Sequence, residues 1–199
     1  MTKNPSEPAT EPTETSAPPR RNPALMAAAI ALPIALVAGV VVAAALANRN
    51  PVLEPVAVGA AETPDAGAAD CVALMSALPE EMGDYQKVAL LDPAPESVAA
   101  WRSTTVADAE PIVLRCGFQR PLEFVQGTSL QEVNNVQWFE IDGSAQGLDA
   151  STWVAVDRSA YVALTLPSDT GSAPIQGVSE AIKSAMPAQD IDPAPAPVP

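Results

Sequence analysis

A long uncharged segment near the start of the chain restricts its fold more than any other feature. The segment covers residues 23–47 and contains no acidic, basic or amide side chain. At about 1.5 Å per residue, its roughly 25 residues would form a helix about 37 Å long, and the hydrocarbon core of a bilayer is about 30 Å thick. The sequence therefore predicts one transmembrane helix, with the lipid bilayer as its partner.

Basic residues beside this segment predict its orientation. Arg20 and Arg21 directly precede it, whereas Arg49 alone follows it. Lys and Arg close to a span stay on the cytoplasmic side of the membrane. We therefore expect a single-pass plasma-membrane protein with its N-terminus in the cytoplasm and its C-terminal domain outside.

A second interpretation of the same segment is a secretory signal. Ala45-Leu46-Ala47 matches the small-residue pattern of a signal cleavage site, so cleavage would follow Ala47. The apolar core of a secretory signal is usually about 7–15 residues, and the segment here is longer. The length favours an uncleaved signal-anchor, and both interpretations remain open at this point.

Composition divides the remainder of the chain into folded and unfolded parts. Segments rich in Pro, Ser, Thr, Gly and acidic residues, with no periodic apolar positions, bury too little surface to fold. The expected parts are a disordered cytoplasmic tail (residues 1–22), the signal-anchor helix (23–47), a flexible linker (48–70), an extracytoplasmic domain (71–187) and a disordered Pro-rich tail (188–199).

Charge and residue content restrict the chemistry of that domain. The formal net charge is −14, so a nucleic acid would be repelled and is not an expected partner. The chain has no histidine and only two cysteines, which removes Ser-His-Asp and Cys-His catalysis and a Cys/His zinc site. No metal, cofactor or catalytic site is predicted, and we expect the protein not to be an enzyme.

The two cysteines predict one disulfide. In residues 71–82, Cys71 shares the apolar face of a helix, and in residues 112–118 strand alternation places Cys116 with the core-facing side chains. An even number of cysteines in an oxidising compartment is typical of a structural disulfide. Closing a loop of about 46 residues would stabilise the fold by roughly 4 kcal/mol.

Apolar periodicity predicts an α+β domain. A helix is expected over residues 71–82 and another over 174–186, with Ile175, Val178, Ile182 and Met186 along its buried side. Strands are expected at 85–91, 112–118, 136–141, 152–156 and 161–166, and residues 96–110 fit either a helix or a strand. The order predicts a mainly antiparallel sheet covered on one face by two helices.

Several motifs together resemble a family of actinobacterial envelope proteins, DUF3515. They are Cys71 opening a helix that ends in Leu78-Pro79, the strand Pro111–Gly117, Asn135–Trp138, Val156–Arg158 and Leu166-Pro167. Trp101 is followed by Arg102 where the family pattern has glycine, so this segment is expected to differ. The resemblance implies an envelope location and a paired cysteine, and it implies no particular activity.

Three residues are candidates for contacting a partner. Arg115 should emerge on the sheet face opposite the core, where it would bind an anion or pair with a neighbouring acid. Trp138 and Phe139 lie on opposite sides of one strand, so one belongs to the core and the other is free for a contact or covers the sheet. Arg158, within Asp157-Arg158-Ser159, is typical of a turn.

Three functions remain open from the sequence. The first is a non-catalytic accessory or binding module that contacts a membrane protein complex or an envelope component. The second is a small-ligand or cell-wall-component binding domain, with an apolar concavity between sheet and helices and one convergent charge, such as Arg115. The third is a hydrolase using two carboxylates about 5–9.5 Å apart, for which the candidate pairs are Glu80/Glu81, Asp108/Glu110 and Glu140/Asp142.

Overall fold

A computed structural model describes residues 33–43, 53–106 and 108–196, and the chain divides into two units, Met1–Pro51 and Val52–Pro199. In the first unit, residues 33–43 form an exposed helix. None of the helices within the described ranges is both long enough and apolar enough to cross a membrane. The rest of the predicted span, residues 23–32 and 44–47, lies outside the described residues, as do the whole predicted cytoplasmic tail (1–22) and the start of the linker (48–52).

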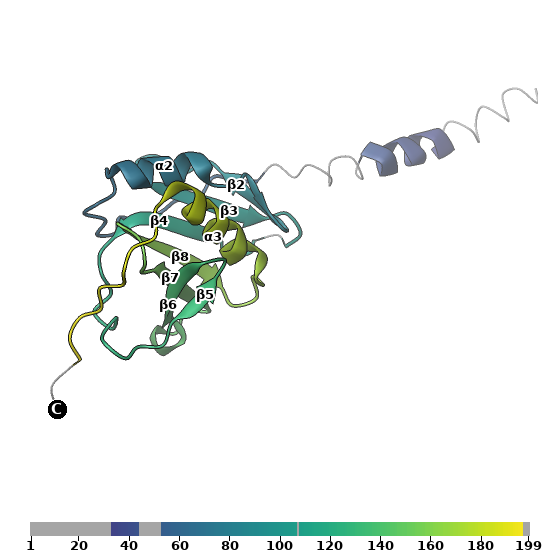
Figure 1. Cartoon of the computed structure of the whole chain (residues 1–199). Coiled ribbons are helices and arrows are strands. Elements are labelled where there is room, and N and C mark those ends of the chain that lie inside the picture. Colours follow the sequence, from purple (N-terminus) through teal and green to yellow (C-terminus); the bar gives the residue numbers. More distant parts are fainter. Residues whose placement is uncertain (1–32, 44–52, 107, 197–199) are drawn as a thin grey trace, which may run out of the picture. The chain divides into compact units, whose positions relative to one another are not determined.

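The second unit is built on an eight-stranded sheet in which every neighbouring pair is antiparallel (Figure 1). Its strand order is β1-β2-β3-β4-β8-β7-β6-β5. The strands are β1 (Glu81–Met82), β2 (Tyr85–Val88), β3 (Val98–Ser103), β4 (Ile112–Phe118), β5 (Gln131–Val133), β6 (Val136–Asp142), β7 (Ala150–Ala155) and β8 (Tyr161–Pro167). The predicted α+β class with an antiparallel sheet is confirmed.

Two helices cover one face of this sheet, as predicted. They are α2 (Ala69–Ala77) and α3 (Ala173–Ala185), which pack against each other. A buried tryptophan joins each helical region to the sheet: the indole N–H of Trp101 donates to Pro79 O at 2.9 Å, and that of Trp138 donates to Ser179 Oγ at 3.0 Å. The predicted inner side of the second helix is confirmed, because its four apolar residues are buried.

Local chemistry explains where the elements differ from the sequence prediction. The first helix ends at Ala77 rather than near residue 82, because Pro79 disfavours helical backbone at Leu78, which is extended at φ −63° and ψ 134°. The ambiguous segment 96–110 contains strand β3. Strand β5 was not predicted; it pairs with β6 through Asn134 and Asn135, whose φ values of 50° and 64° fit a type I′ hairpin turn.

The predicted disulfide is confirmed. Cys71 and Cys116 are bonded at an S–S distance of 2.00 Å, and both are fully buried. The bond joins α2 to the middle strand β4, so the first helix is covalently attached to the sheet.

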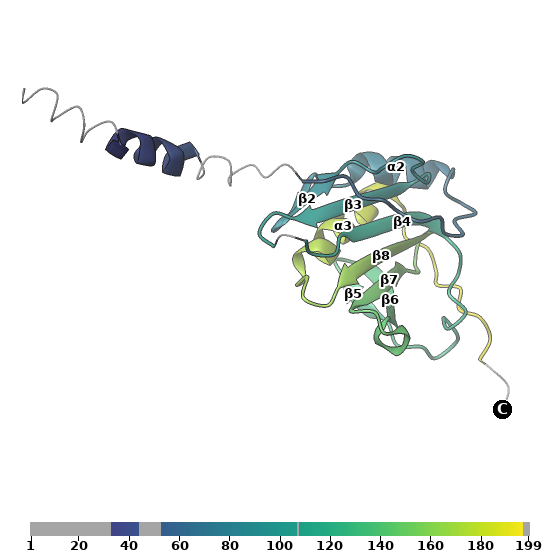
Figure 2. The ribbon, with the colours of Figure 1, turned by 180° about the vertical axis from the view of Figure 1, so that it is seen from behind.

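Residues 53–68, which the sequence predicted as part of a flexible linker, instead form a strap on the other face of the sheet (Figure 2). The strap is held mainly by main-chain hydrogen bonds: Val56 N donates to Ala89 O at 3.0 Å, and Val56 O accepts from Leu91 N at 2.9 Å. One side chain adds to them, because Arg102 Nε donates to Glu54 O at 3.0 Å. Composition misled the prediction because backbone hydrogen bonds of this kind need no particular side chains.

The strap passes directly over Gly117. This glycine has φ +79° and lies at a bulge in β4, and a Cβ placed on it would be 2.3 Å from Ala66 N and from Asp65 C. Only glycine combines that backbone conformation with so close an approach. The Leu-Arg-Cys-Gly sequence of β4 thus supplies both the disulfide and the crossing point of the strap.

The Pro-rich segment after α3 also differs from its prediction as a disordered tail, as far as residue 196. Gln189 N donates to Asp157 O at 2.9 Å, Ala194 N donates to Phe124 O at 3.0 Å, and Gln126 N donates to Ala194 O at 2.8 Å. Beneath this segment and the loop before β5, a second apolar cluster covers the sheet; it consists of Phe124, Phe139, Val154, Val156 and Ala163. The folded unit therefore extends beyond the predicted 71–187.

We expect Gly117→Ala to lower the free energy of unfolding by about 2 kcal/mol or more, because it adds backbone strain and a clash with the strap. Gly127→Ala is the matched control: its φ is +89°, but nothing lies within 4 Å of an added Cβ. Urea unfolding of both variants separates the two effects. Equal losses in the two variants would show that the strap does not press on Gly117.

Candidate ligand pocket

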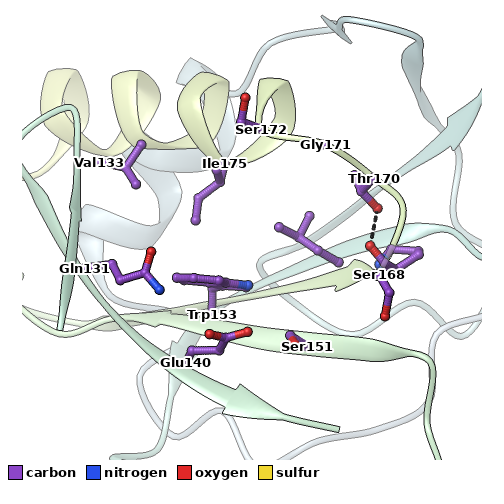
Figure 3. A pocket seen from close by; sticks show the side chains of 12 residues that line it. Gln131, Val133, Glu140, Ser151, Trp153, Ser168, Thr170, Gly171, Ser172 and Ile175 are labelled. Atoms are coloured by element: carbon purple, nitrogen blue, oxygen red, sulfur yellow. Dashed lines mark hydrogen bonds between the residues drawn. The ribbon is translucent and has the colours of Figure 1, made fainter. Parts of the chain in front are cut away.

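A cavity of about 390 Å³ lies between the helix-covered face of the sheet and the start of α3 (Figure 3). Strands β5 to β8 form its floor, and the segment from Pro167 into the first turn of α3 forms its roof and one wall. The lining residues are Gln131, Val133, Glu140, Ser151, Trp153, Leu166, Pro167, Ser168, Thr170, Gly171, Ser172 and Ile175.

Strand register brings the floor residues together. Trp153 of β7 is paired with Glu140 of β6 on one side and with Leu164 of β8 on the other. Directly paired residues point to the same face of a sheet, so these side chains all face the helices. Figure 3 shows the Trp153 indole in the middle of the floor, with Ile175 pointing toward it from α3, Gln131 at its side and Glu140 on the side away from Ile175.

Hydrogen bonds within the segment before α3 hold the roof of the pocket in place. Thr170 Oγ1 and Thr170 N both donate to Pro167 O, at 2.6 and 3.1 Å, which fixes the turn before α3. Gly171 has φ +72°, a backbone conformation that favours glycine. The Trp138–Ser179 hydrogen bond holds the helix over β6 one turn farther along. These contacts keep the pocket open between the first turn of α3 and the sheet.

Glu140 is the only charged residue lining the pocket. Its side chain is exposed, and it forms no ion pair with any residue in the described part of the chain. The pocket thus combines one carboxylate with an aromatic ring, apolar walls from Val133, Leu166 and Ile175, and hydroxyl groups at its rim.

Asp142, the other half of one predicted carboxylate pair, has a different role. It accepts hydrogen bonds from the backbone N–H and the hydroxyl of Ser144, each at 2.8 Å, and these bonds lower the pKa of its carboxyl group. Both bonds lie in the turn that leads into the short 3₁₀ helix η1 (Ser144–Gln146). Asp142 does not line the pocket, and a lowered pKa is opposite to what a general acid requires.

Trp138 and Phe139 both belong to apolar clusters. Trp138 has 0% of its surface exposed and lies under α3, whereas Phe139 faces the other side of the sheet and its ring lies 5.7 Å from that of Phe124. The structure therefore leaves neither of these aromatic residues exposed for a partner.

Arg115 emerges opposite the helices, as predicted, and so it lies on the other face of the sheet from the pocket. It is half-buried; its Nε has no hydrogen-bond partner among the described residues, and burial lowers the pKa of its guanidinium group. Arg115 was the predicted example of a convergent charge, but the charged residue that lines the pocket is Glu140.

Arg158 lies in the bend between β7 and β8, as predicted, and it also forms a buried ion pair. Its side chain is 2% exposed; Nη1 lies 2.8 Å from Asp157 Oδ2, and Nη2 donates to Asn135 O at 3.0 Å. Asn135 belongs to the β5–β6 turn, and Asp157-Arg158 lies between β7 and β8. Arg158 therefore connects two hairpins, and the two family motifs that contain these residues meet here.

Neither Trp153 nor Gln131 was predicted from the sequence as a site residue, and Glu140 was predicted only as half of a carboxylate pair. Alternation along residues 150–155 places Trp153 on the inner face, which is the single signal available from sequence. The Trp153 ring is partly exposed beneath α3 because of the conformation of the segment that forms the roof of the pocket. Apolar periodicity does not predict that conformation.

We expect Arg158→Ala to lower the free energy of unfolding by about 3–5 kcal/mol, because it leaves the buried Asp157 carboxylate unpaired. Arg120→Ala is the control, since the Arg120–Asp192 pair is exposed, with 42% and 87% of the two side chains accessible. An exposed pair contributes about 0–1 kcal/mol. If urea unfolding gave the same loss for both variants, the buried connection would have no special role.

Comparison with known families agrees with the resemblance seen in the sequence. A family model described as "Protein of unknown function (DUF3515)" matches residues 30–191, which include every residue that lines the pocket. Searches of curated proteins and of solved structures found no match. Since the family model covers most of its length, this chain belongs to the DUF3515 family.

Proposed function

We propose that this protein is a non-catalytic binding module tethered on the outer side of the plasma membrane, and that its ligand site is the pocket beneath α3. The observation that supports this most strongly is the pocket itself: about 390 Å³, with the Trp153 ring as its floor. Sites for small molecules are usually about 300–1,000 Å³ and mainly apolar, with a few polar groups that orient the ligand.

Binding without catalysis fits the residues that line the pocket. Glu140 is the only acidic residue there, and the lining includes no Lys, Arg, Cys or Tyr that would complete an acid–base or nucleophilic pair. The chain also has no histidine. The polar groups that remain, mainly hydroxyls and the Gln131 amide, are suited to forming hydrogen bonds with a ligand.

The extracytoplasmic location is supported by two independent features. The uncharged residues 23–47, preceded by Arg20 and Arg21, carry the charge pattern of an anchor with its N-terminus inside. The Cys71–Cys116 disulfide fits an oxidising compartment outside the cytoplasm. The envelope is therefore the proposed source of the ligand.

The pocket also changes the order of the functions considered. An accessory subunit of a membrane complex was the first hypothesis from topology alone. A concavity between sheet and helices with one convergent charge was the requirement for the ligand-binding alternative. Because the pocket beneath α3 meets that requirement, ligand binding becomes the first candidate, and the accessory subunit becomes the second.

Topology is tested by adding protease to intact cells that make the full chain with a C-terminal tag. We expect the tag and the domain to be digested, because residues after the anchor are outside, while a cytoplasmic control protein stays intact. Protection of the domain until the cells are lysed would contradict the proposed location.

Ligand binding is tested through Trp153. Trp101 and Trp138 are fully buried, so acrylamide should quench mainly the Trp153 emission of the full chain in detergent micelles, and Trp153→Phe should remove the quenchable part. We expect a low-molecular-mass fraction of an envelope extract to protect Trp153 from acrylamide and to do so saturably.

Two neighbouring residues of β5 supply the matched variants. Gln131 lines the pocket, and Glu132 points to the other face of the sheet. Protection should weaken several-fold in Gln131→Ala and stay unchanged in Glu132→Ala. Failure of every fraction to protect Trp153, or chemical conversion of the bound compound, would contradict the proposal.

A further inference from the structure

We propose that the ligand of this pocket carries a substituted ammonium group, which lies against the Trp153 indole beside the Glu140 carboxylate. This inference rests on the proposed function and specifies the class of ligand. Three observations support it: the partly exposed Trp153 ring, the position of the Glu140 carboxylate and the negative charge around the pocket.

Trp153 is the only tryptophan of the three whose ring is partly open. It is half-buried, whereas Trp101 and Trp138 have no exposed surface. Figure 3 shows its ring along the floor, with the pocket between it and Ile175. The face of an indole carries negative electrostatic potential and attracts organic cations more strongly than other aromatic rings do.

Glu140 lies directly beside this ring. The two residues are register partners on β6 and β7, and such partners have their Cβ atoms about 4.5–5.5 Å apart. Because neither Lys nor Arg lines the pocket, the Glu140 charge is not compensated by a cation there. A positively charged group at the ring would therefore be attracted both by the indole and by the uncompensated carboxylate of the neighbouring strand.

The surroundings of the pocket have the same sign of charge. A second hollow, which shares Pro167 and Thr170 with the pocket, is lined by four acidic residues, Asp84, Glu110, Asp149 and Asp169. The whole chain has a net charge of −14. This field attracts cations toward the pocket and repels anionic ligands.

The pocket walls distinguish an organic cation from a metal ion. Val133, Leu166 and Ile175 are apolar and would contact alkyl substituents, whereas a metal ion requires several oxygen, nitrogen or sulfur ligands. Within the described residues, no group of three or more His, Cys, Asp or Glu side chains is arranged to hold a metal. The geometry therefore fits a nitrogen carrying methyl or methylene groups.

Choline is a suitable probe, and 3,3-dimethylbutan-1-ol is its neutral counterpart of nearly the same shape. We expect choline to protect Trp153 of the full chain from acrylamide in a saturable way, and the neutral alcohol to be at least about fivefold weaker. Glu140→Gln keeps the shape of the side chain and removes its charge, so it should weaken choline binding about five- to tenfold.

Glu132→Gln is the matched control, because it removes one charge from the adjacent strand on the opposite face. It should leave choline binding within about twofold of the unaltered chain. Glu140 is exposed, so its variant should fold normally, which unfolding curves would verify.

The possible outcomes separate this inference from the proposed function. Equal protection by choline and the neutral alcohol, or no effect of Glu140→Gln, would overturn the proposal of an ammonium ligand. The pocket would then select its ligand by shape rather than by charge. No protection by choline at all would also overturn it, while the envelope-extract experiment would decide the proposed function independently.

Discussion

The hydrogen bond between the Trp138 indole and the Ser179 hydroxyl is the contact on which the pocket depends. Both residues have 0% of their surface exposed, and Ser179 Oγ donates in turn to Ile175 O, at 2.7 Å, in the first turn of α3. Leaving a buried donor without a partner costs about 1–3 kcal/mol, so this chain of bonds fixes where α3 crosses the sheet. That position keeps Ile175 above Trp153 and the pocket open.

The two faces of the sheet are covered in different ways. On one face, α2 and α3 enclose the larger core, and the Cys71–Cys116 bond attaches α2 to the middle of the sheet. On the other face, the strap formed by residues 53–68 and the segment after α3 cover the sheet, and main-chain hydrogen bonds hold both in place. A sheet covered on both faces gives the floor of the pocket a fixed shape, which lowers the cost of ordering a binding site.

Periodicity alone was enough to predict the elements with a clear apolar pattern. The strand at 112–118, the hairpin of β7 and β8 and the inner side of α3 follow from it. The Cys71–Cys116 bond needed, in addition, the presence of only two cysteines and the expectation of an oxidising compartment. The strap and the C-terminal segment were misread because their composition is that of a linker, whereas backbone hydrogen bonds with residues distant in sequence hold them. Arg158 lies in the connection between β7 and β8 as predicted, but its bond to Asn135 was not foreseen because Asn135 is on another hairpin. The pocket could not be predicted because it depends on the register of four strands and on the conformation of the loop before α3. Neither can be derived from the local sequence of a single segment.

Hydrogen exchange of the three indole N–H groups, followed by NMR in the full chain, tests the central claim most directly. The account predicts two slowly exchanging signals, from Trp101 and Trp138, whose N–H groups are buried and hydrogen-bonded, and one fast signal, from Trp153. The substitution Trp153→Phe should remove the fast signal and leave the slow ones in place. Slow exchange of all three, or fast exchange of Trp138, would contradict an open pocket beneath a fixed α3.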